Sequence, residues 1–456
     1  MSQSNRISWL VISVTLLALT GILVQTALAE PAIRIDPNEV DAVDAAKTRD
    51  PVISNPSPYE PITKCKQCHI ELTDQWISSG HATAYRNRVF RYYFSQYKDY
   101  VRYNWNRSTE IIDEQGRKRR VPKIPRFRGR DAASVVIKGQ ILEENQYDIK
   151  VKNPKEYAGI PCLKCHAPGA FYTGDEEPFK LENSKDGVFC DFCHTVIDYT
   201  DDLGFEIFPG MIKQGPRRTP VTGPHAIEFS YLFQKSVFCK PCHDDLYNNN
   251  GIKILDTYTE WYNSLWREAG TTCQDCHMAG YEGRSTKNGE LRFDVADHSF
   301  YGVRDPEFLQ TAADLDMESV IEGDNVNLTV TVTNSGVGHY LPSAWPLRQL
   351  VLIIRVKNAD DETLWSDKRV YSRIYVDENN KITYNIWEPV AILDDTRLEP
   401  GEERVEEFTF PVPENPATSV ITAQLFFRQL PEGDVVDIQD QPRPIRIKGL
   451  STFVQE

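Results

Sequence analysis

The sequence lacks three features that define other classes of protein. Only one long apolar run is present, residues 9–24, and this excludes a protein that crosses a membrane many times. Positive charge is in deficit: 51 Lys and Arg residues face 66 Asp and Glu residues, and the net charge of -15 excludes a general nucleic-acid binder. Hydrophobic residues are not scarce, at 40% of 456 residues, so a disordered chain is excluded as well. We expect a soluble protein of two or three domains.

The N-terminal apolar run has the pattern of a secretory signal. It follows a short, weakly positive leader, and the small residues Ala27 and Ala29 come just before Glu30. We expect cleavage after Ala29, which makes residues 1–29 a signal peptide and leaves no stable membrane span. An uncleaved anchor helix is the alternative, because a run of this length approaches the thickness of a bilayer. In both cases the rest of the chain is expected outside the cytoplasm, in the periplasm or at the cell surface.

No cysteine lies outside a single repeated motif, Cys-x-x-Cys-His, which occurs five times and uses all ten cysteines. The five strings are Cys65, Cys68 and His69; Cys162, Cys165 and His166; Cys190, Cys193 and His194; Cys239, Cys242 and His243; and Cys273, Cys276 and His277. The two thiols of such a string add to the two vinyl groups of a porphyrin, and the adjacent imidazole lies under the iron. One string alone would also fit a zinc site or a thiol–disulfide site. Five strings without a spare cysteine predict five covalently attached haem c groups.

The histidines are one too few to give every iron a second imidazole. Of nine histidines, five belong to the strings. The four spare ones are His81, His225, His298 and His339. Four spare imidazoles for five irons favour pairs of histidines as axial ligands. The fifth iron is then five-coordinate, or it takes Lys or Met (Met211 or Met317), or it receives a histidine from another chain.

Spacing restricts which histidines can share an iron. If the twelve residues from His69 to His81 are mostly helical, they span about 18 Å. Two ligands of one iron lie only about 4 Å apart. We therefore expect His81 to bind a haem other than the one at His69, and we interpret His225 and His298 in the same way. The motif Cys-x-x-Cys-Lys is missing, so the lysine-ligated catalytic haem of pentahaem nitrite reductases has no counterpart here.

The composition changes along the chain and predicts an α + β multidomain protein. Residues 30–61 are proline-rich and aperiodic, which is typical of a mobile arm. Residues 62–310 hold all five strings and predict a mostly helical or irregular haem domain, with the haems themselves as its core. Residues 311–456 contain short alternating runs such as 326–332, which predict an immunoglobulin-like β-sandwich. The basic segment 117–130 is either a solvated loop or a contact for haem propionates, a neighbouring subunit or an anionic partner.

Several short motifs resemble the cytochrome c-554-type multihaem family. They are Trp76-x-x-Ser79-x-His81-Ala82, Gly187-Val188-Phe189 before the third string, Gly223-Pro224-His225, and His298-Ser299-Phe300-Tyr301-Gly302. The loop Gly338-His339-Tyr340-Leu341-Pro342-Ser343 is similar to one in extended members that carry a C-terminal β domain. The resemblance implies that His81, His225 and His298 are distal haem ligands, and it suggests the same for His339. It also implies that neighbouring subunits can polymerise, because related multihaem chains form extracellular wires.

Three functions are compatible with these features. The first is an exported electron carrier that passes electrons between redox proteins through closely spaced haems. The second is a reductase of a small oxidised nitrogen compound such as nitrite or hydroxylamine, acting at one five-coordinate haem. The third is a homopolymeric filament in which a histidine is supplied by the next subunit.

Overall fold

The computed structural model describes residues 57–105, 108–112, 118–122, 160–175, 179–200, 204–218, 223–244, 246–248, 250–433, 438 and 441–454. The chain divides into two units, Met1–Pro51 and Val52–Glu456, and all described residues belong to the second. The expected signal peptide, most of the expected arm and most of the basic segment lie outside them. Within these ranges, no helix is long and apolar enough to cross a membrane.

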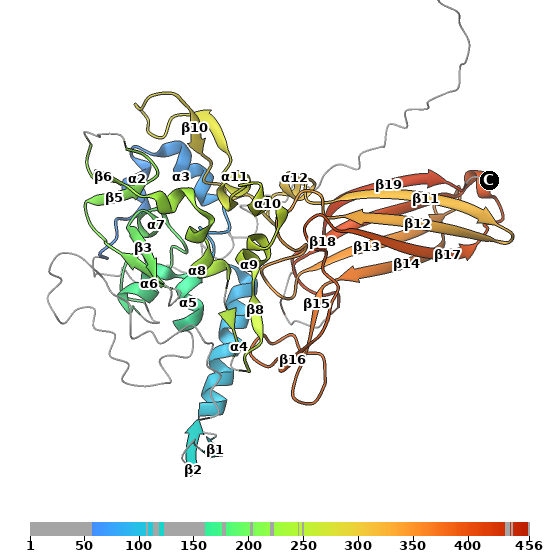
Figure 1. The fold of residues 1–456 in the computed structure, drawn as a ribbon, viewed down its shortest axis with the longest axis horizontal. Helices are drawn as coiled ribbons and strands as arrows, with labels where there is room; N and C mark the ends of the chain where they lie inside the picture. The colour runs from blue at the N-terminus through green and yellow to red at the C-terminus, as the bar shows by residue number, and fades with distance from the viewer. Residues whose placement is uncertain are drawn as a thin grey trace, which may run out of the picture. The chain divides into compact units, whose positions relative to one another are not determined.

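Short helices carry the five strings (Figure 1). The helices up to residue 310 are α2 (Ile62–Lys66), α3 (Ile70–Ile77), α4 (Arg88–Trp105), α5 (Ile160–His166), α6 (Pro168–Thr173), α7 (Cys190–Cys193), α8 (Lys240–His243), α9 (Thr257–Tyr262), α10 (Leu265–Glu268), α11 (Cys273–His277) and α12 (Pro306–Leu309), with 3₁₀ turns η2 (Tyr231–Gln234) and η3 (Ser236–Phe238). A helical turn places residues three apart on one face, so both thiols of a string point the same way. α11 shows a local cause: Thr272 and Asp275 form a capping box at its start.

Small two-stranded sheets connect these helices. They are β1 (Ser108–Ile112) with β2 (Lys118–Pro122), β3 (Val196–Thr200) with β4 (Gly204–Ile207), β5 (Ile212–Gly215) with β6 (Ala226–Phe229), β7 (Leu246–Tyr247) with β8 (Lys253–Leu255), and β9 (Gly280–Gly283) with β10 (Arg292–Ala296). Only β5 and β6 run parallel among these pairs. The buried side chains between them are mainly aromatic and form small separate clusters, one around Phe189 and Phe192 and another around Phe90 and Phe94.

The C-terminal part consists of two larger antiparallel sheets (Figure 1). One has the order β11 (Asp314–Glu322), β12 (Asn325–Thr333), β17 (Glu403–Pro411); the other has the order β14 (Thr363–Tyr371), β13 (Gln349–Lys357), β18 (Val420–Arg428), β19 (Ile445–Phe453). β12 and β18 alternate strictly between buried and partly buried residues along most of their length, as expected when one face of a strand packs on a core. Leu328 of β12, Leu352 of β13 and Phe410 of β17 belong to one shared core, so the two sheets pack face to face.

A second cluster joins this sheet part to the haem-string part. Tyr93 and Tyr97 of α4 pack with Trp387, which lies between β15 (Arg373–Val376) and β16 (Ala391–Asp395). Cys162 of the second string borders the same cluster. The sheet part is therefore packed against a haem attachment string through aromatic side chains.

Candidate haem sites

Eight of the nine histidines stand in four pairs of opposed rings, each made of one string histidine and one spare histidine. The pairs and their ring-centre distances are His69 with His225 at 6.3 Å, His194 with His298 at 6.4 Å, His243 with His81 at 6.2 Å, and His277 with His339 at 6.4 Å. Each spare imidazole thus has a different string histidine opposite it.

The spacing of these rings fits one iron between each pair. Two metal–nitrogen bonds of about 2 Å each, with about 1 Å from each nitrogen to its ring centre, separate the ring centres by about 6 Å. The observed distances of 6.2 to 6.4 Å match this sum. Rings that packed directly on one another would lie closer, as the ring of His166 does against Phe90 at 3.8 Å. The donor set and the spacing therefore suit a haem iron with two axial imidazoles.

Backbone carbonyls orient most of the rings. The Nδ1 atoms of His69, His194 and His277 donate to carbonyl oxygens at 2.7, 2.7 and 2.5 Å. Nδ1 of His298 and Nδ1 of His339 each donate to a backbone carbonyl oxygen at 2.8 Å. A proton fixed on Nδ1 leaves Nε2 as the free lone pair, which is the arrangement that supports a metal-binding histidine.

Burial keeps these imidazoles neutral. It lowers the pKa of His81 to about 3 and the pKa values of His166, His194, His243 and His339 to about 4. Burial also lowers the pKa values of His69, His277 and His298. The side chains nonetheless remain accessible: eight of the nine histidines are half-buried, and His243 is exposed. Neutral imidazole is the form that binds iron, and the space beside it leaves room for a macrocycle.

Thiols from different strings approach one another. Cys65 of the first string contacts Cys190 of the third. Cys165 of the second string contacts Cys242 of the fourth, and Cys239 of the fourth contacts Cys273 of the fifth. All ten cysteines, each within a described range, are free thiols. Attachment points for different haems are therefore adjacent, although the strings are far apart in the sequence.

His166 is the string histidine without a second imidazole. All nine histidines are described, and the other eight are used in the four pairs. Nδ1 of His166 donates to the carbonyl of Ala84 at 2.9 Å, and its ring stacks on Phe90 of α4 at an interplanar angle of 10°. The sequence count left one iron short of an imidazole, and the pairing assigns that deficit to the second string. Of the two candidate methionines, Met317 packs against the β core and Met211 is exposed.

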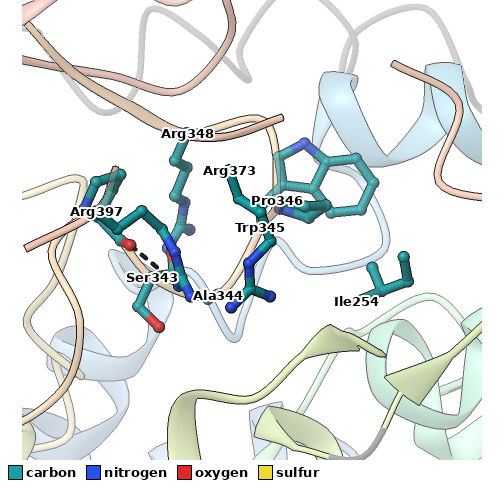
Figure 2. Close-up of a pocket in the computed structure, with 9 residues that line it drawn as sticks. Ile254, Ser343, Ala344, Trp345, Pro346, Arg348, Arg373 and Arg397 are labelled. Carbon is teal, nitrogen blue, oxygen red and sulfur yellow. Dashed lines mark hydrogen bonds between the residues drawn. The ribbon is translucent and has the colours of Figure 1, made fainter. Parts of the chain in front are cut away.

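His339 comes from the sheet part, in the loop between β12 and β13 that continues to Arg348. The loop borders a small enclosed cavity of about 10 Å³, which is lined by Trp345, Arg348, Arg373 and Arg397 among others (Figure 2). This volume suffices for about one water molecule. The cavity is therefore not a substrate pocket.

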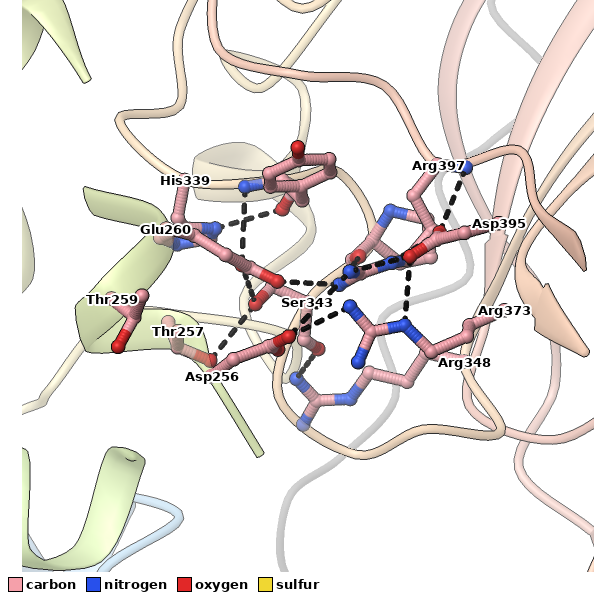
Figure 3. Close-up of polar contacts among 12 residues, drawn as sticks. Asp256, Thr257, Thr259, Glu260, His339, Ser343, Arg348, Arg373, Asp395 and Arg397 are labelled. Carbon is pink, nitrogen blue, oxygen red and sulfur yellow. Dashed lines mark hydrogen bonds and ion pairs between the residues drawn. The ribbon is translucent and has the colours of Figure 1, made fainter. Parts of the chain in front are cut away.

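Charged residues fasten this loop to α9 (Figure 3). Glu260 of α9 accepts from Arg397 at 2.6 Å, from the Ser343 hydroxyl at 2.5 Å and from the Tyr340 backbone N–H at 3.2 Å. Burial raises the pKa of Glu260 to about 7, although the positive charge of Arg397 acts to lower it. The bonds hold the residues on either side of the loop's Leu341–Pro342 segment, next to His339. We call Glu260, Arg397 and Ser343 the loop clamp.

Three further ion pairs extend the loop clamp. Arg373 of β15 pairs with Asp256 at 2.7 Å and with Asp395 of β16 at 2.8 Å, and Arg397 pairs with Asp395 at 2.8 Å. Burial alone would raise the pKa of Asp395, but Arg397 and Arg373 outweigh it and hold that pKa below its usual value. No sequence pattern identified these residues, because isolated Arg and Glu residues are common on surfaces. Their role depends on contacts between segments distant in the chain.

Comparisons with known proteins concern the fold and the family of the chain. A family model described as cytochrome c554 and c-prime matches residues 131–195, which include the second and third strings. No curated protein matches the chain. Among solved structures, a penta-heme cytochrome c552 from Thermochromatium tepidum aligns with 88% of this chain and 100% of its own, at 20% identity and a TM-score of 0.61. At this identity the likeness concerns the fold.

A second solved structure, a beta-glucuronidase from Bacteroides uniformis, aligns with 25% of this chain and 11% of its own, at 14% identity. Its TM-score of 0.14 is too low to carry an argument. The resemblance that the sequence motifs predicted is confirmed by the family match and by the shared cytochrome fold. Together with the attachment strings, they support a multihaem c-type cytochrome.

Proposed function

We propose that this chain is an exported electron-transfer cytochrome with five covalently attached haem c groups. The observation that carries the proposal is the set of four imidazole pairs at 6.2 to 6.4 Å. In each pair the string histidine is the proximal ligand, and His81, His225, His298 or His339 is the distal one. The cysteines of the five strings form the thioether bonds.

The ligand set explains why electron transfer is favoured over catalysis. When bound, haem iron carries one electron at a time by cycling between its ferric and ferrous states. Two imidazoles close both axial positions at four sites, so no substrate can bind to those irons. Paired imidazoles also hold the reduction potential below that of a His/Met site. The thiol contacts join the first string to the third, and join the second, fourth and fifth in series, which supports electron passage between neighbouring haems.

We infer domain bounds of 62–310 for the pentahaem domain and 311–456 for an immunoglobulin-like β-sandwich. A three-stranded and a four-stranded antiparallel sheet around one core support the second assignment. Export through the signal peptide 1–29, to the periplasm or the cell surface, is part of the proposal because c-type haem is attached outside the cytoplasm. Other redox proteins are the proposed electron donors and acceptors.

Low-temperature electron paramagnetic resonance (EPR) of the oxidised protein tests this function. We expect four low-spin irons from the four imidazole pairs and one further iron whose spin state depends on its sixth ligand. Mass spectrometry of the native protein is expected to find a chain that begins after Ala29 and carries five haem groups. Mostly high-spin iron, or a chain without covalent haem, would refute the proposal.

The iron at His166 favours a second candidate function. With one imidazole from its own chain, this iron would stay five-coordinate and reduce a small oxidised nitrogen compound. In a homopolymer the next subunit would supply a histidine only by opening one of its own four pairs, because each chain has nine histidines for five haems. Carbon monoxide binding to the reduced protein, with turnover of nitrite or hydroxylamine, would support the reductase. Filaments in electron micrographs would support the polymer, with four low-spin signals from bis-imidazole irons as in the single chain, because nine histidines per chain complete only four pairs.

A further inference from the structure

His81 differs from most of the paired histidines in how its ring is held. Its ring crosses that of His243 at 63°, whereas the rings of the other three pairs cross at 6° to 24°. Six of the eight paired histidines donate Nδ1 to a backbone carbonyl oxygen. Among the described hydrogen bonds, none involves a ring nitrogen of His81. Rotation about an iron–nitrogen bond is weakly hindered, so another contact must decide the plane of this ring.

The backbone of His81 is fixed by the segment just before the third string. The Val188 backbone N–H donates to the His81 carbonyl oxygen at 2.9 Å, and the Trp76 indole N–H donates to the Val188 carbonyl at 2.8 Å. Gly187 has a left-handed backbone, at φ +68°, and a Cβ there would collide with the His81 carbonyl oxygen. Only a glycine permits this close approach. The position of His81 is therefore set by its backbone, and the rotation of its ring is left open.

The ring of Phe300 contacts the ring of His81. The two ring centres lie 4.3 Å apart and the planes cross at 72°, which is the edge-to-face arrangement that aromatic rings favour. Phe300 also meets His298 edge to face, at 5.9 Å and 79°. It packs on the cluster around Phe189 and Phe192. One side chain thus contacts the histidines that stand opposite the third and fourth strings.

The backbone of Phe300 is held in a conformation that this residue type rarely adopts. Its φ is +49°, in the left-handed region. The Ser299 backbone N–H and the Tyr301 hydroxyl both donate to the Asp297 carboxylate, at 2.6 and 2.9 Å, and so close the turn from either side. The Tyr301 carbonyl accepts from Nδ1 of His277 at 2.5 Å. Strain of this kind persists only where the surroundings enforce it, and it is concentrated at functional sites.

We propose that Phe300 is a positioning residue that fixes the ring plane of His81, steeply crossed to that of His243. This inference rests on the proposed pentahaem function. The backbone contacts place the His81 imidazole opposite the fourth string, and the Phe300 ring limits its rotation there. Crossed imidazoles act on different d orbitals of one iron. The contact therefore gives the haem at His243 an electronic structure unlike that of the haems between nearly parallel rings.

EPR of the haem-loaded variant Phe300→Leu tests the assignment. We expect all five haems to stay attached and the iron of His243 and His81 to stay low-spin. Its strongly anisotropic signal is expected to be lost and replaced by a rhombic one, because the ring of His81 can then turn. Phe300→Tyr keeps the aromatic ring and is expected to retain the wild-type signal. Phe293→Leu is the matched control: Phe293 of β10 is 79% exposed, and no change is expected.

Two outcomes would overturn the assignment. One is an unchanged anisotropic signal in fully loaded Phe300→Leu. The other is a high-spin signal in its place, because Phe300 would then keep His81 bound rather than set its ring plane. If Phe300→Leu fails to fold, Phe300→Asn removes the ring with a residue that tolerates a left-handed backbone, and the same spectral change is expected. A wild-type protein without low-spin haem would instead refute the underlying function.

Discussion

The sheet part and the haem-string part bury their hydrophobic residues differently. In the sheet part, Leu328, Leu352, Phe410 and other aliphatic and aromatic residues from both sheets meet in one continuous core. In the haem-string part, the buried residues form small clusters, and none of the nine histidines is fully buried. The first part resembles an ordinary globular domain, in which side chains pack against side chains. The second part depends on a group that the chain does not encode.

Preventing haem attachment is expected to give the largest difference in stability between the two parts. When the full chain is produced without haem, the haem-string part should lack its core and be digested by protease, while residues from about 311 to 454 remain as a resistant fragment. The physical reason is that only the sheet part buries enough of its own apolar surface. Limited proteolysis with mass spectrometry measures this. A full-length apoprotein as resistant as the holoprotein would contradict the comparison.

Breaking the loop clamp is expected to have the next largest effect. Arg397→Leu leaves Glu260 buried without its cation and should cost about 3–5 kcal/mol of unfolding free energy. It should also release the loop that carries His339, so that one low-spin EPR signal becomes high-spin. Denaturant titration and EPR measure the two effects. Lys357→Leu is the control, because its pair with Asp361 is largely exposed and contributes under about 1 kcal/mol; equal losses in both variants would disprove the clamp.

A cavity in the sheet core should lower the stability of the sheet part and leave the haem-string part unchanged. Leu352→Ala in β13 is expected to cost about 2–5 kcal/mol. Far-ultraviolet circular dichroism should report the lower stability, while haem absorption before unfolding stays unchanged. The neighbouring Ile353 is only partly buried and points to the other face of the strand, so Ile353→Ala should cost less. If Ile353→Ala costs as much as Leu352→Ala, the core lies elsewhere.

The smallest effect concerns ligand geometry rather than stability. His339, from the sheet part, lies nearly parallel to His277, at 6°, whereas His81, from the haem-string part, meets His243 at 63°. Parallel imidazoles add their effects on the iron d orbitals, and nearly perpendicular ones cancel. We therefore expect rhombic low-spin EPR signals from the irons of the parallel pairs. The iron held by His243 and His81 is expected to give one strongly anisotropic signal. That anisotropic signal should vanish in His81→Ala and persist in His339→Ala.

The alternating run at 326–332 predicted one central strand well. It lies within β12, which has a neighbouring strand on each side. β14 and β19 are edge strands of the four-stranded sheet, and they had no clear pattern because most of their residues are exposed or half-buried. An edge strand covers less of the core and therefore needs fewer apolar residues.

The sequence alone predicts where haem is attached, and it determined how many imidazoles are available. Attachment is local chemistry, since two thiols and one imidazole within five consecutive residues suffice for it. Only the tertiary structure decided which histidine stands opposite which string, that His166 is the one without a second imidazole, and that Glu260 and Arg397 hold the loop of His339. The reason is that two axial ligands must lie within a few ångströms of each other, and segments far apart in the sequence are brought that close only by the folding of the whole chain.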